Sequence, residues 1–189
     1  MDATIVIATH GSEEWHQRGN NLAIKTTDAF PGIEVVFGHG PREQLHEVRN
    51  RLAARATSEW LCFLDADDEL APGYFRAMEA ATGDLRAPAV RWVYADGRHE
   101  QQVLDDRDIE VGNPCVIGTL IRKDLFDEIG GFKKWWAWED WALFLSAHRK
   151  GAVLEHVPDA VYIANVRENS RNQGVKNKQR LYKLIRMQS

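Results

Sequence analysis

The chain has no long hydrophobic run. No apolar stretch reaches the roughly 18 residues that a helix needs to cross a bilayer, so the sequence predicts no membrane span. The N-terminal segment carries an acid at position 2, and its short apolar run meets polar residues by Thr9. This pattern is typical of a first β-strand rather than of a signal peptide.

Cysteine is scarce as well. The 189 residues contain only Cys62 and Cys115, and each lies inside an apolar run. This distribution favours small buried residues over a disulfide framework or a metal site. It indicates a reducing compartment, and we therefore expect a cytoplasmic protein.

Repeats, low-complexity tracts and linkers are absent. Hydrophobic residues make up 44% and charged residues 28% of the sequence, as in an ordinary globular chain. These values predict one domain, residues 1–189, that is large enough to bury a core. A net charge of −4 argues against a dedicated duplex DNA binder.

The charge is uneven, because the C-terminal segment 165–189 is basic. It holds seven Lys or Arg residues against one Glu, which leaves the remainder of the chain acidic. One interpretation is a solvated helix face. The other is a patch for an anionic acceptor, a nucleic acid or a membrane surface.

Short apolar runs alternate with helical patterns in the first half of the chain. The β-branched run 4–9 is typical of a strand that is covered on both faces, and Ser12 marks the start of a helix. Further along, a turn and strand are predicted at 31–37, a strand at 59–65, and helices at 13–30, 42–57 and 71–82. This order predicts an α/β fold with a Rossmann-like, largely parallel sheet and helices on both faces.

The second half is less regular. Asp96-Gly97 is a strong signal for a hairpin, and Gly130-Gly131 is typical of a helix end. The expected elements are two extended arms within 88–105, a strand and a short helix within 115–132, a helix at 138–152, and short strands at 152–157 and 160–165. The sheet is therefore expected to be mixed, although mostly parallel.

Three carboxylates, Asp65, Asp67 and Asp68, come directly after the third predicted strand. In open α/β sheets the ligand crevice lies at the carboxyl ends of the strands, where Thr9 is also expected. Crowded carboxylates repel one another unless a cation or a proton intervenes, and such oxygen ligands suit Mg²⁺ or Mn²⁺. Alternatively, the acids cap the helix that begins near Pro72, but one Asp would suffice for a cap.

Two blocks of the sequence resemble the signatures of family 2 glycosyltransferases of the GT-A fold. Residues 49–75 hold an Arg-Asn pair and a strand that ends in Leu-Asp-Ala-Asp-Asp before a Pro, which resembles the donor-side block with its DXD motif. Residues 126–132 end in Gly-Gly-Phe, and 138–151 hold a Glu-Asp pair at the head of a helix that ends in Gly. These two segments resemble the acceptor-side block.

The resemblance covers roughly residues 4–165 and implies a single GT-A-type domain. Its nucleotide-sugar-binding half would be residues 1–95 and its acceptor-side half residues 96–164. Residues 165–189 would form a basic C-terminal tail.

The resemblance also implies roles for the donor-side residues. Asp67 would ligate a divalent metal ion, Mn²⁺ or Mg²⁺, and Asp65 would support the metal shell or hold the ribose of the nucleotide. Asp68 would support these two acids or cap a helix. Thr9 and Arg49 would contact the nucleotide base.

On the acceptor side, the resemblance implies that Asp140 is the catalytic base. Glu139 would orient the site or touch the acceptor. Trp138 and Trp141 flank this pair, and an aromatic face there would stack on a sugar ring. For Trp141 a role in core packing is an equal alternative.

The implied reaction moves a sugar from a nucleoside-diphosphate sugar to an acceptor hydroxyl. The metal ion would neutralise the departing diphosphate, and one carboxylate would take the proton of the attacking hydroxyl. One base and an in-line displacement give inversion, and the sequence offers no separate nucleophile for a retaining pathway. The acceptor is left open among a glycan, a protein, a small molecule and a modified nucleotide, and so is the oligomeric state.

The sequence departs from the family pattern at Gly38 and His39, where members usually carry two acids that help to read the base. His39 would donate a hydrogen bond in their place or be an ordinary loop residue. A UDP-sugar is the expected donor, with GDP- and dTDP-sugars as alternatives.

The family often supplies a late His as a third metal ligand, and none follows the last predicted strand here. Asn165, Glu168 or water would take that place. Arg167 and Arg171 are candidates for contacts to the diphosphate or to an acidic acceptor.

Two other functions compete with glycosyl transfer. The first is a catalytically inactive module of the same fold that binds a sugar or a nucleotide. The second is a nucleotidyltransferase, which would need a basic, Gly-rich phosphate loop after the first strand. The segment 8–18 carries acids where that loop should be, which argues against it.

Overall fold

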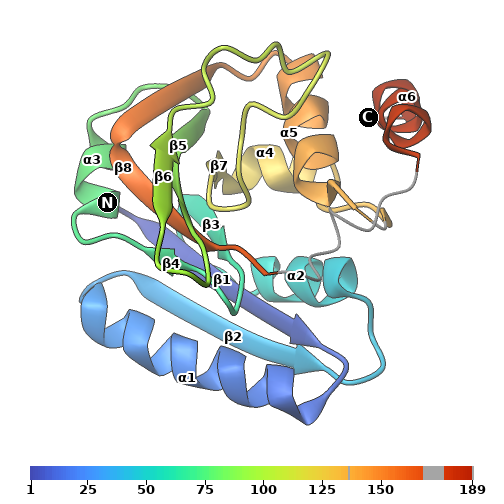
Figure 1. Cartoon of the computed structure of the whole chain (residues 1–189). Coiled ribbons are helices and arrows are strands. Elements are labelled where there is room, and N and C mark those ends of the chain that lie inside the picture. Colours follow the sequence, from blue (N-terminus) through green and yellow to red (C-terminus); the bar gives the residue numbers. More distant parts are fainter. Residues whose placement is uncertain (136, 168–176, 189) are drawn as a thin grey trace.

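The first apolar run forms the middle strand of a parallel β-sheet region. β1 (Ala3–His10) lies between β2 (Glu34–Gly40) and β3 (Trp60–Leu64) and is parallel to both. The first seven residues of β1 are buried, as expected for a strand covered on both faces. The computed structural model describes residues 1–135, 137–167 and 177–188, arranged as Figure 1 shows.

Beyond β3 the sheet is mixed, in the order β2-β1-β3-β7-β5-β8-β4, with β6 paired to β5. The remaining strands are β4 (Glu69–Leu70), β5 (Leu85–Val93), β6 (His99–Gln102), β7 (Leu120–Arg122) and β8 (Leu154–Asn165). The ladders of β1 with β2 and β3, and of β5 with β8, are long and parallel, whereas the antiparallel ladders are short. The predicted mixed, mostly parallel sheet is confirmed.

Helices α1 (Glu13–Ala29) and α2 (Leu45–Ala53) cover opposite faces of the sheet. Successive residues of a strand point to opposite faces. On β2, Phe37 faces Gly19 of α1, where an added Cβ would lie 2.5 Å from the ring. The next residue, Gly38, faces Leu52 of α2, and a Cβ there would lie 2.8 Å from that side chain. The two glycines let the helices approach the sheet closely, and the prediction of helices on both faces is confirmed.

The other helices lie after the strands of the second half. They are α3 (Tyr74–Glu79), α4 (Lys123–Glu128), α5 (Glu139–Arg149) and α6 (Lys178–Gln188). Gly130 and Gly131 follow α4 with φ values of 75° and 65°, as the Gly-Gly pair predicted. Figure 1 shows α6 beside α5, and its inner face buries Leu181 and Ile185. None of the described helices has the length and apolarity that crossing a membrane requires.

The prediction of two short strands near the C-terminus was wrong. Segments 152–157 and 160–165 belong to one strand, β8. The register of β8 against β5 shifts between Pro88 and Ala89, and residues 158–160 form a bulge there. Pro88 has no N–H to donate to the ladder, which favours an irregularity at this point.

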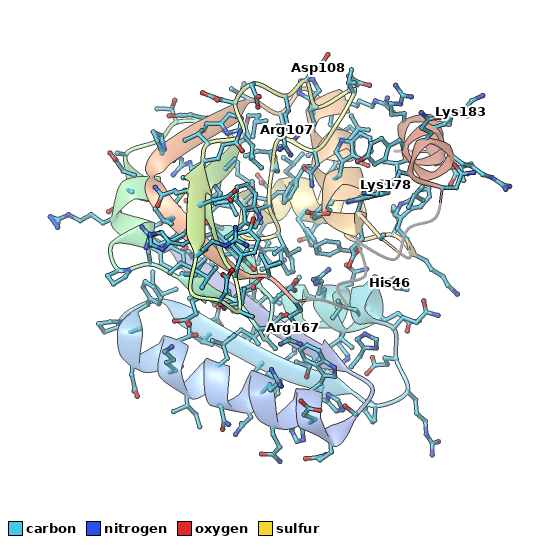
Figure 2. All side chains as sticks on the ribbon, viewed as in Figure 1. His46, Arg107, Asp108, Arg167, Lys178 and Lys183 are labelled. Carbon is cyan, nitrogen blue, oxygen red and sulfur yellow. The ribbon has the colours of Figure 1, made fainter. Side chains whose placement is uncertain are left out.

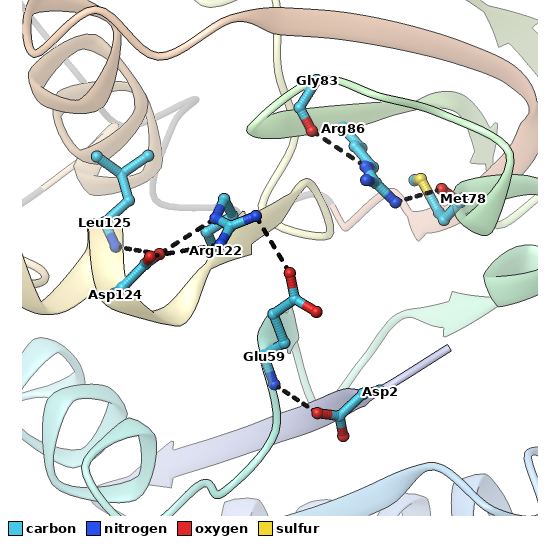
Figure 3. Close-up of polar contacts among 8 residues, drawn as sticks. All are labelled: Asp2, Glu59, Met78, Gly83, Arg86, Arg122, Asp124 and Leu125. Carbon is cyan, nitrogen blue, oxygen red and sulfur yellow. Dashed lines mark hydrogen bonds and ion pairs between the residues drawn. The ribbon is translucent and has the colours of Figure 1, made fainter.

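The end of β3 that lies away from Asp65 is closed by a polar network (Figure 3). Arg122 pairs with Glu59 at 3.1 Å and with Asp124 at 3.3 Å, and the Glu59 backbone N–H donates to Asp2. Arg86 donates to two backbone carbonyls nearby. These contacts tie the starts of β1 and β3 to β7, so the opposite ends of β1 and β3 remain open for a site.

Candidate active site

The loop after β3 gathers three carboxylates. Asp65, Asp67 and Asp68 each offer an oxygen, and these oxygens lie within 4.8 Å of one another. A turn closed by the hydrogen bond from the Asp68 N–H to the Asp65 carbonyl brings them together. All three side chains are half-buried. The short strand β4, which the sequence did not predict, follows at once and pairs with β8.

The end of β8 fixes this loop. The Tyr162 hydroxyl and the Asn165 N–H donate to Asp68 at 2.7 and 2.8 Å, and the Asn165 side chain donates to the Asp67 carbonyl at 2.6 Å. Asp68 therefore does not cap α3, whose N-cap is Gly73 in the left-handed region. That alternative was wrong, because β8 offers Asp68 two donors of its own.

The crowding of the carboxylates is reflected in the pKa values of Asp67 and Asp68. Burial first, and then the charges of Asp65 and Asp67, raise the pKa of Asp68 to about 8. The pKa of Asp67 is also raised, chiefly by burial and then by Asp65. A cation among the three carboxylates would offset this repulsion. The cluster of hard oxygen donors therefore fits Mg²⁺ or Mn²⁺.

Arg49 of α2 connects this loop to the second pair of acids. Its guanidinium lies 2.6 Å from Asp65 and 3.0 Å from Glu139, and the residue is only 2% exposed. The guanidinium also lies over the Phe132 ring, 5.0 Å from the centroid. Burial alone would lower the pKa of Arg49, but Asp65, Glu139 and Asp140 together raise it, so the group stays charged. Two acids that are 74 positions apart in the sequence thus share one buried cation.

The second pair of acids begins helix α5. Trp138 precedes it with φ 55° and ψ 33°, a left-handed conformation that is uncommon for a residue with a side chain. Asp140 accepts a hydrogen bond from the Asn113 side chain at 3.0 Å. Burial first, and then the charge of Glu139, raise the pKa of Asp140 to about 6. Trp141 is fully buried and donates to the Ile109 carbonyl, so it packs in the core.

Both groups of acids open onto one cavity of about 660 Å³. Its walls come from the ends of β1 and β8, the loop after β3, α2 and the start of α5. The residues that line it include Thr9, Trp15, Arg49, Asp65, Asp67, Asp68, Trp138, Glu139, Asp140, Asn165 and Arg167. The sequence predicted two separate acidic motifs, and the fold brings them into one cleft.

Most of the predicted site residues line this cavity, and His39 is the exception. The His39 ring nitrogen lies 3.0 Å from the Thr9 hydroxyl, and the ring stacks on His16 of α1. His39 therefore stands behind Thr9 and does not line the cavity. Arg49 lines the cavity, although Asp65 and Glu139 already occupy its guanidinium.

Several residues of the site were missed by sequence reasoning. Trp15 and Trp92 line the cavity, Asn113 contacts Asp140, and Tyr162 contacts Asp68. Trp15 lies in the first turn of a helix that follows β1, which is a position that could have suggested it. For Asn113 and Tyr162 the sequence carries no local signal, because their contacts are made across the fold.

Arg167, a candidate from the sequence, does reach the site. Its guanidinium lies 3.1 Å from Asp67 and 4.7 Å from the centroid of the Trp15 ring. Two other candidates, Glu168 and Arg171, lie outside the described residues.

Comparisons with known proteins agree with this geometry. The family model described as glycosyl transferase family 2 matches residues 21–107. A search of curated protein sequences finds no match. Among solved structures, S. aureus TarS 1–349 in complex with UDP-GlcNAc superposes with a TM-score of 0.66 at 15% identity, covering 98% of this chain and 65% of that one.

A second solved structure is similar to the same degree. GalNAc-T7 with UDP, GalNAc and Mn²⁺ superposes with a TM-score of 0.63 at 16% identity, covering 98% of this chain and 47% of that one. The chain thus spans less than two thirds of either protein. The resemblance seen in the sequence is confirmed: the chain has the GT-A fold, and its residues 21–107 match the model of glycosyl transferase family 2.

Proposed function

We propose that the chain is an inverting, metal-dependent glycosyltransferase that moves a sugar from a UDP-sugar to an acceptor hydroxyl. The observation that carries this proposal is the single cavity onto which Asp65, Asp67 and Asp140 all open. A metal-binding cluster and a base facing one space is the arrangement that such a displacement requires. The structures of TarS with UDP-GlcNAc and of GalNAc-T7 with UDP support UDP as the donor's nucleotide.

Asp67 and Asp65 are the proposed metal ligands, and Asp68 stays with Tyr162 and Asn165 to hold their loop. When bound, Mn²⁺ or Mg²⁺ supplies positive charge that stabilises the departing diphosphate. Arg49 holds Asp65 in place through its contact at 2.6 Å. The GalNAc-T7 structure with Mn²⁺ supports this ion as a first choice.

Asp140 is the proposed base. A carboxyl group with a pKa of about 6 is ionised at neutral pH, yet it is more basic than an ordinary Asp. It takes the proton of the acceptor hydroxyl while that oxygen bonds to the anomeric carbon and the carbon–oxygen bond to the diphosphate breaks. Glu139 shares the buried Arg49, so its charge is balanced and it orients the site. With one base on the acceptor side, the displacement inverts the anomeric centre.

The aromatic and polar walls provide for the rest of the donor and acceptor. Thr9 lies at the end of β1, where an α/β sheet binds nucleotides, and its hydroxyl is fixed by His39. We assign the nucleotide to this side, with Arg49 as part of its surroundings. Trp138, next to the base, offers a ring to a sugar of the donor or acceptor.

The two proposed binding functions follow the order of the chain. We assign nucleotide-sugar binding to residues 1–95 and acceptor binding to residues 96–164, and residues 165–189 form the basic C-terminal tail of the sequence. The acceptor class stays open among a glycan, a protein, a small molecule and a modified nucleotide. A cytoplasmic location is likewise part of the proposal.

The test is an assay of purified protein with a panel of sugar nucleotides and Mn²⁺. We expect metal-dependent binding of one donor class and slow release of UDP, which Asp67→Ala abolishes. Asp28→Ala, at an exposed position of α1, serves as the matched control and should behave as the parent chain. Failure of every donor to bind, with and without metal, would refute the proposal.

The second candidate is a binding module that does not turn over. The observation that favours it is the loss of the acidic pair on β2, where Gly38 packs on Leu52 and His39 stands behind Thr9. Such a module would bind UDP or a glycan without Mn²⁺ and release no UDP from a sugar nucleotide. Calorimetry with and without the metal distinguishes the two candidates.

A further inference from the structure

A cation of the chain itself already touches the proposed metal site. Arg167 follows the end of β8, and its Nε lies 3.1 Å from the Oδ2 atom of Asp67. Figure 2 shows it near the start of α1, and its guanidinium lies over the Trp15 ring, 4.7 Å from the centroid. The two side chains of the ion pair are 34% and 24% exposed, so the contact is open to exchange.

Arg167 and a divalent ion would compete for the same carboxylate. A metal ion bound by Asp65 and Asp67 would place two positive charges within a few ångströms of the guanidinium. The repulsion would be strong because the half-buried site is poorly screened by water. The contact with Asp67 and the binding of the metal therefore exclude or weaken each other.

The Trp15 ring gives the displaced guanidinium a place to stay. An arginine over an aromatic face is held by a cation–π interaction that does not depend on the carboxylate. Both Trp15 and Arg167 line the cavity. After leaving Asp67, the guanidinium would still face the space that the diphosphate enters.

We propose that Arg167 exchanges partners when the site is loaded: it occupies Asp67 before the metal binds and moves to the diphosphate afterwards, with Trp15 as its pivot. This inference rests on the proposed function, because it takes Asp67 as a metal ligand. Its particular consequence is a pair of effects with opposite signs. Arg167 weakens the binding of the metal alone and strengthens the binding of the nucleotide in the presence of the metal.

The experiment is calorimetric titration of Arg167→Gln and the parent chain, first with MnCl₂ alone and then with UDP at saturating Mn²⁺. We expect Arg167→Gln to bind Mn²⁺ about five- to tenfold more tightly and UDP about tenfold more weakly, as for typical coupling between sites. Arg167→Lys keeps the charge and should show smaller changes of both signs. Thermal unfolding of each variant establishes that it is folded.

The matched control is Arg18→Gln. Arg18 also lies over Trp15, at 5.7 Å from the centroid, but it pairs with Glu14 rather than with Asp67. Its charge acts on Asp67 without a direct contact, so Arg18→Gln should raise the affinity for Mn²⁺ clearly less than Arg167→Gln does. In addition, Asp67→Asn should abolish the gain in Mn²⁺ affinity when combined with Arg167→Gln, since the gain acts through that carboxylate.

The outcomes separate this inference from the proposed function. Equal affinity for Mn²⁺ in Arg167→Gln and the parent chain overturns the exchange while leaving the metal site intact. A loss of affinity for both ligands overturns it as well, because it assigns Arg167 a merely structural role. Failure of the parent chain and every variant to bind Mn²⁺ overturns the metal site and the exchange together.

Discussion

The two groups of acids that meet at the cavity are held in different ways. The donor-side group of three carboxylates lies on a short loop, where Arg49 pairs with Asp65 and Arg167 pairs with Asp67. The acceptor-side group begins a helix, where Glu139 shares Arg49 and Asp140 faces the neutral amide of Asn113. The first group thus has an excess of negative charge, whereas the second leaves one carboxylate without a cation in contact.

This difference separates two chemical tasks. Burial and then neighbouring carboxylates raise the pKa of Asp67 and Asp68, and a divalent ion would relieve this repulsion. Asp140, beside a neutral donor, keeps a basic lone pair because burial and then the charge of Glu139 raise its pKa more than Arg49 lowers it. The arginine that joins the groups, Arg49, balances Asp65 and Glu139 and leaves Asp67 and Asp140 available.

The largest expected effect comes from removing Asp140, the proposed base. Asp140→Asn should lower the rate of transfer by about 100- to 10,000-fold, which is the usual contribution of a general base. The affinity for the nucleotide should stay the same, since the donor-side acids are intact. Asp28→Asn, the same change at an exposed position, is the control.

Loss of folding would not explain that result. Because the fold raises the pKa of Asp140 above its ordinary value, ionising this group opposes folding at neutral pH. The Asn variant should therefore be at least as stable as the parent chain near pH 7. An active Asp140→Asn variant would contradict the assignment of the base.

The next effect tests the connection between the two groups. Arg49→Met removes the cation that Asp65 and Glu139 share, and it should lower the free energy of unfolding by about 3–5 kcal/mol, as for other broken buried pairs. The deficit should shrink as the pH falls, because protonation removes the uncompensated negative charges. Denaturant unfolding at two pH values measures both quantities. Adding Glu139→Gln to Arg49→Met should restore part of the lost stability, because it removes one uncompensated charge. If it restores none, Arg49 does not stabilise the fold by neutralising Glu139.

A smaller effect tests the support of the donor-side loop. A Cβ at Gly118 would lie 2.2 Å from the Tyr162 ring, and the Tyr162 hydroxyl holds Asp68. Gly118→Ala should push this ring aside and destabilise the fold by about 1–3 kcal/mol. It should also weaken Mn²⁺ binding, measured by calorimetry. Gly112→Ala, where an added Cβ meets nothing within 4 Å, is the control.

The smallest effect concerns the partner of the base. Asn113 donates to the charged form of Asp140, and this hydrogen bond lowers the pKa of that carboxyl. Asn113→Ala should therefore move the acidic limb of the pH–rate profile upward by about one pH unit. Asn113→Asp should move it further, since a second negative charge opposes ionisation. Profiles that coincide with that of the parent chain would show that Asn113 does not tune the base.

Local patterns in the sequence were sufficient for the acids and for most of the elements. The run that ends at Asp65 and the Glu-Asp pair at the head of α5 are each set by neighbours in the chain, and both lie where they were expected. The partners of these acids were less accessible. From the sequence, Arg49 was interpreted as a contact to the nucleotide base. In the structure it contacts Glu139, which lies 90 positions away in the chain.

The errors have the same origin. β8 continues as one strand through a bulge at residues 158–160, where its register against β5 shifts between Pro88 and Ala89. A bulge depends on how two strands pair, so one segment of sequence alone does not predict it. Asp68 is bound by Tyr162 and Asn165 rather than by a helix end, again through contacts between distant segments. Such contacts depend on the register of the sheet, which hydrophobic patterns do not specify.

The position of Arg49 has a consequence for how the protein is made. A ribosome releases Arg49 and Asp65 long before it reaches Glu139, so the emerging chain holds a guanidinium whose carboxylate partner Glu139 is still unsynthesised. Packing α2 fully against the sheet would then bury a cation that is only half neutralised. Stable packing of α2 in the first half is therefore expected to require the arrival of α5, which supplies Glu139.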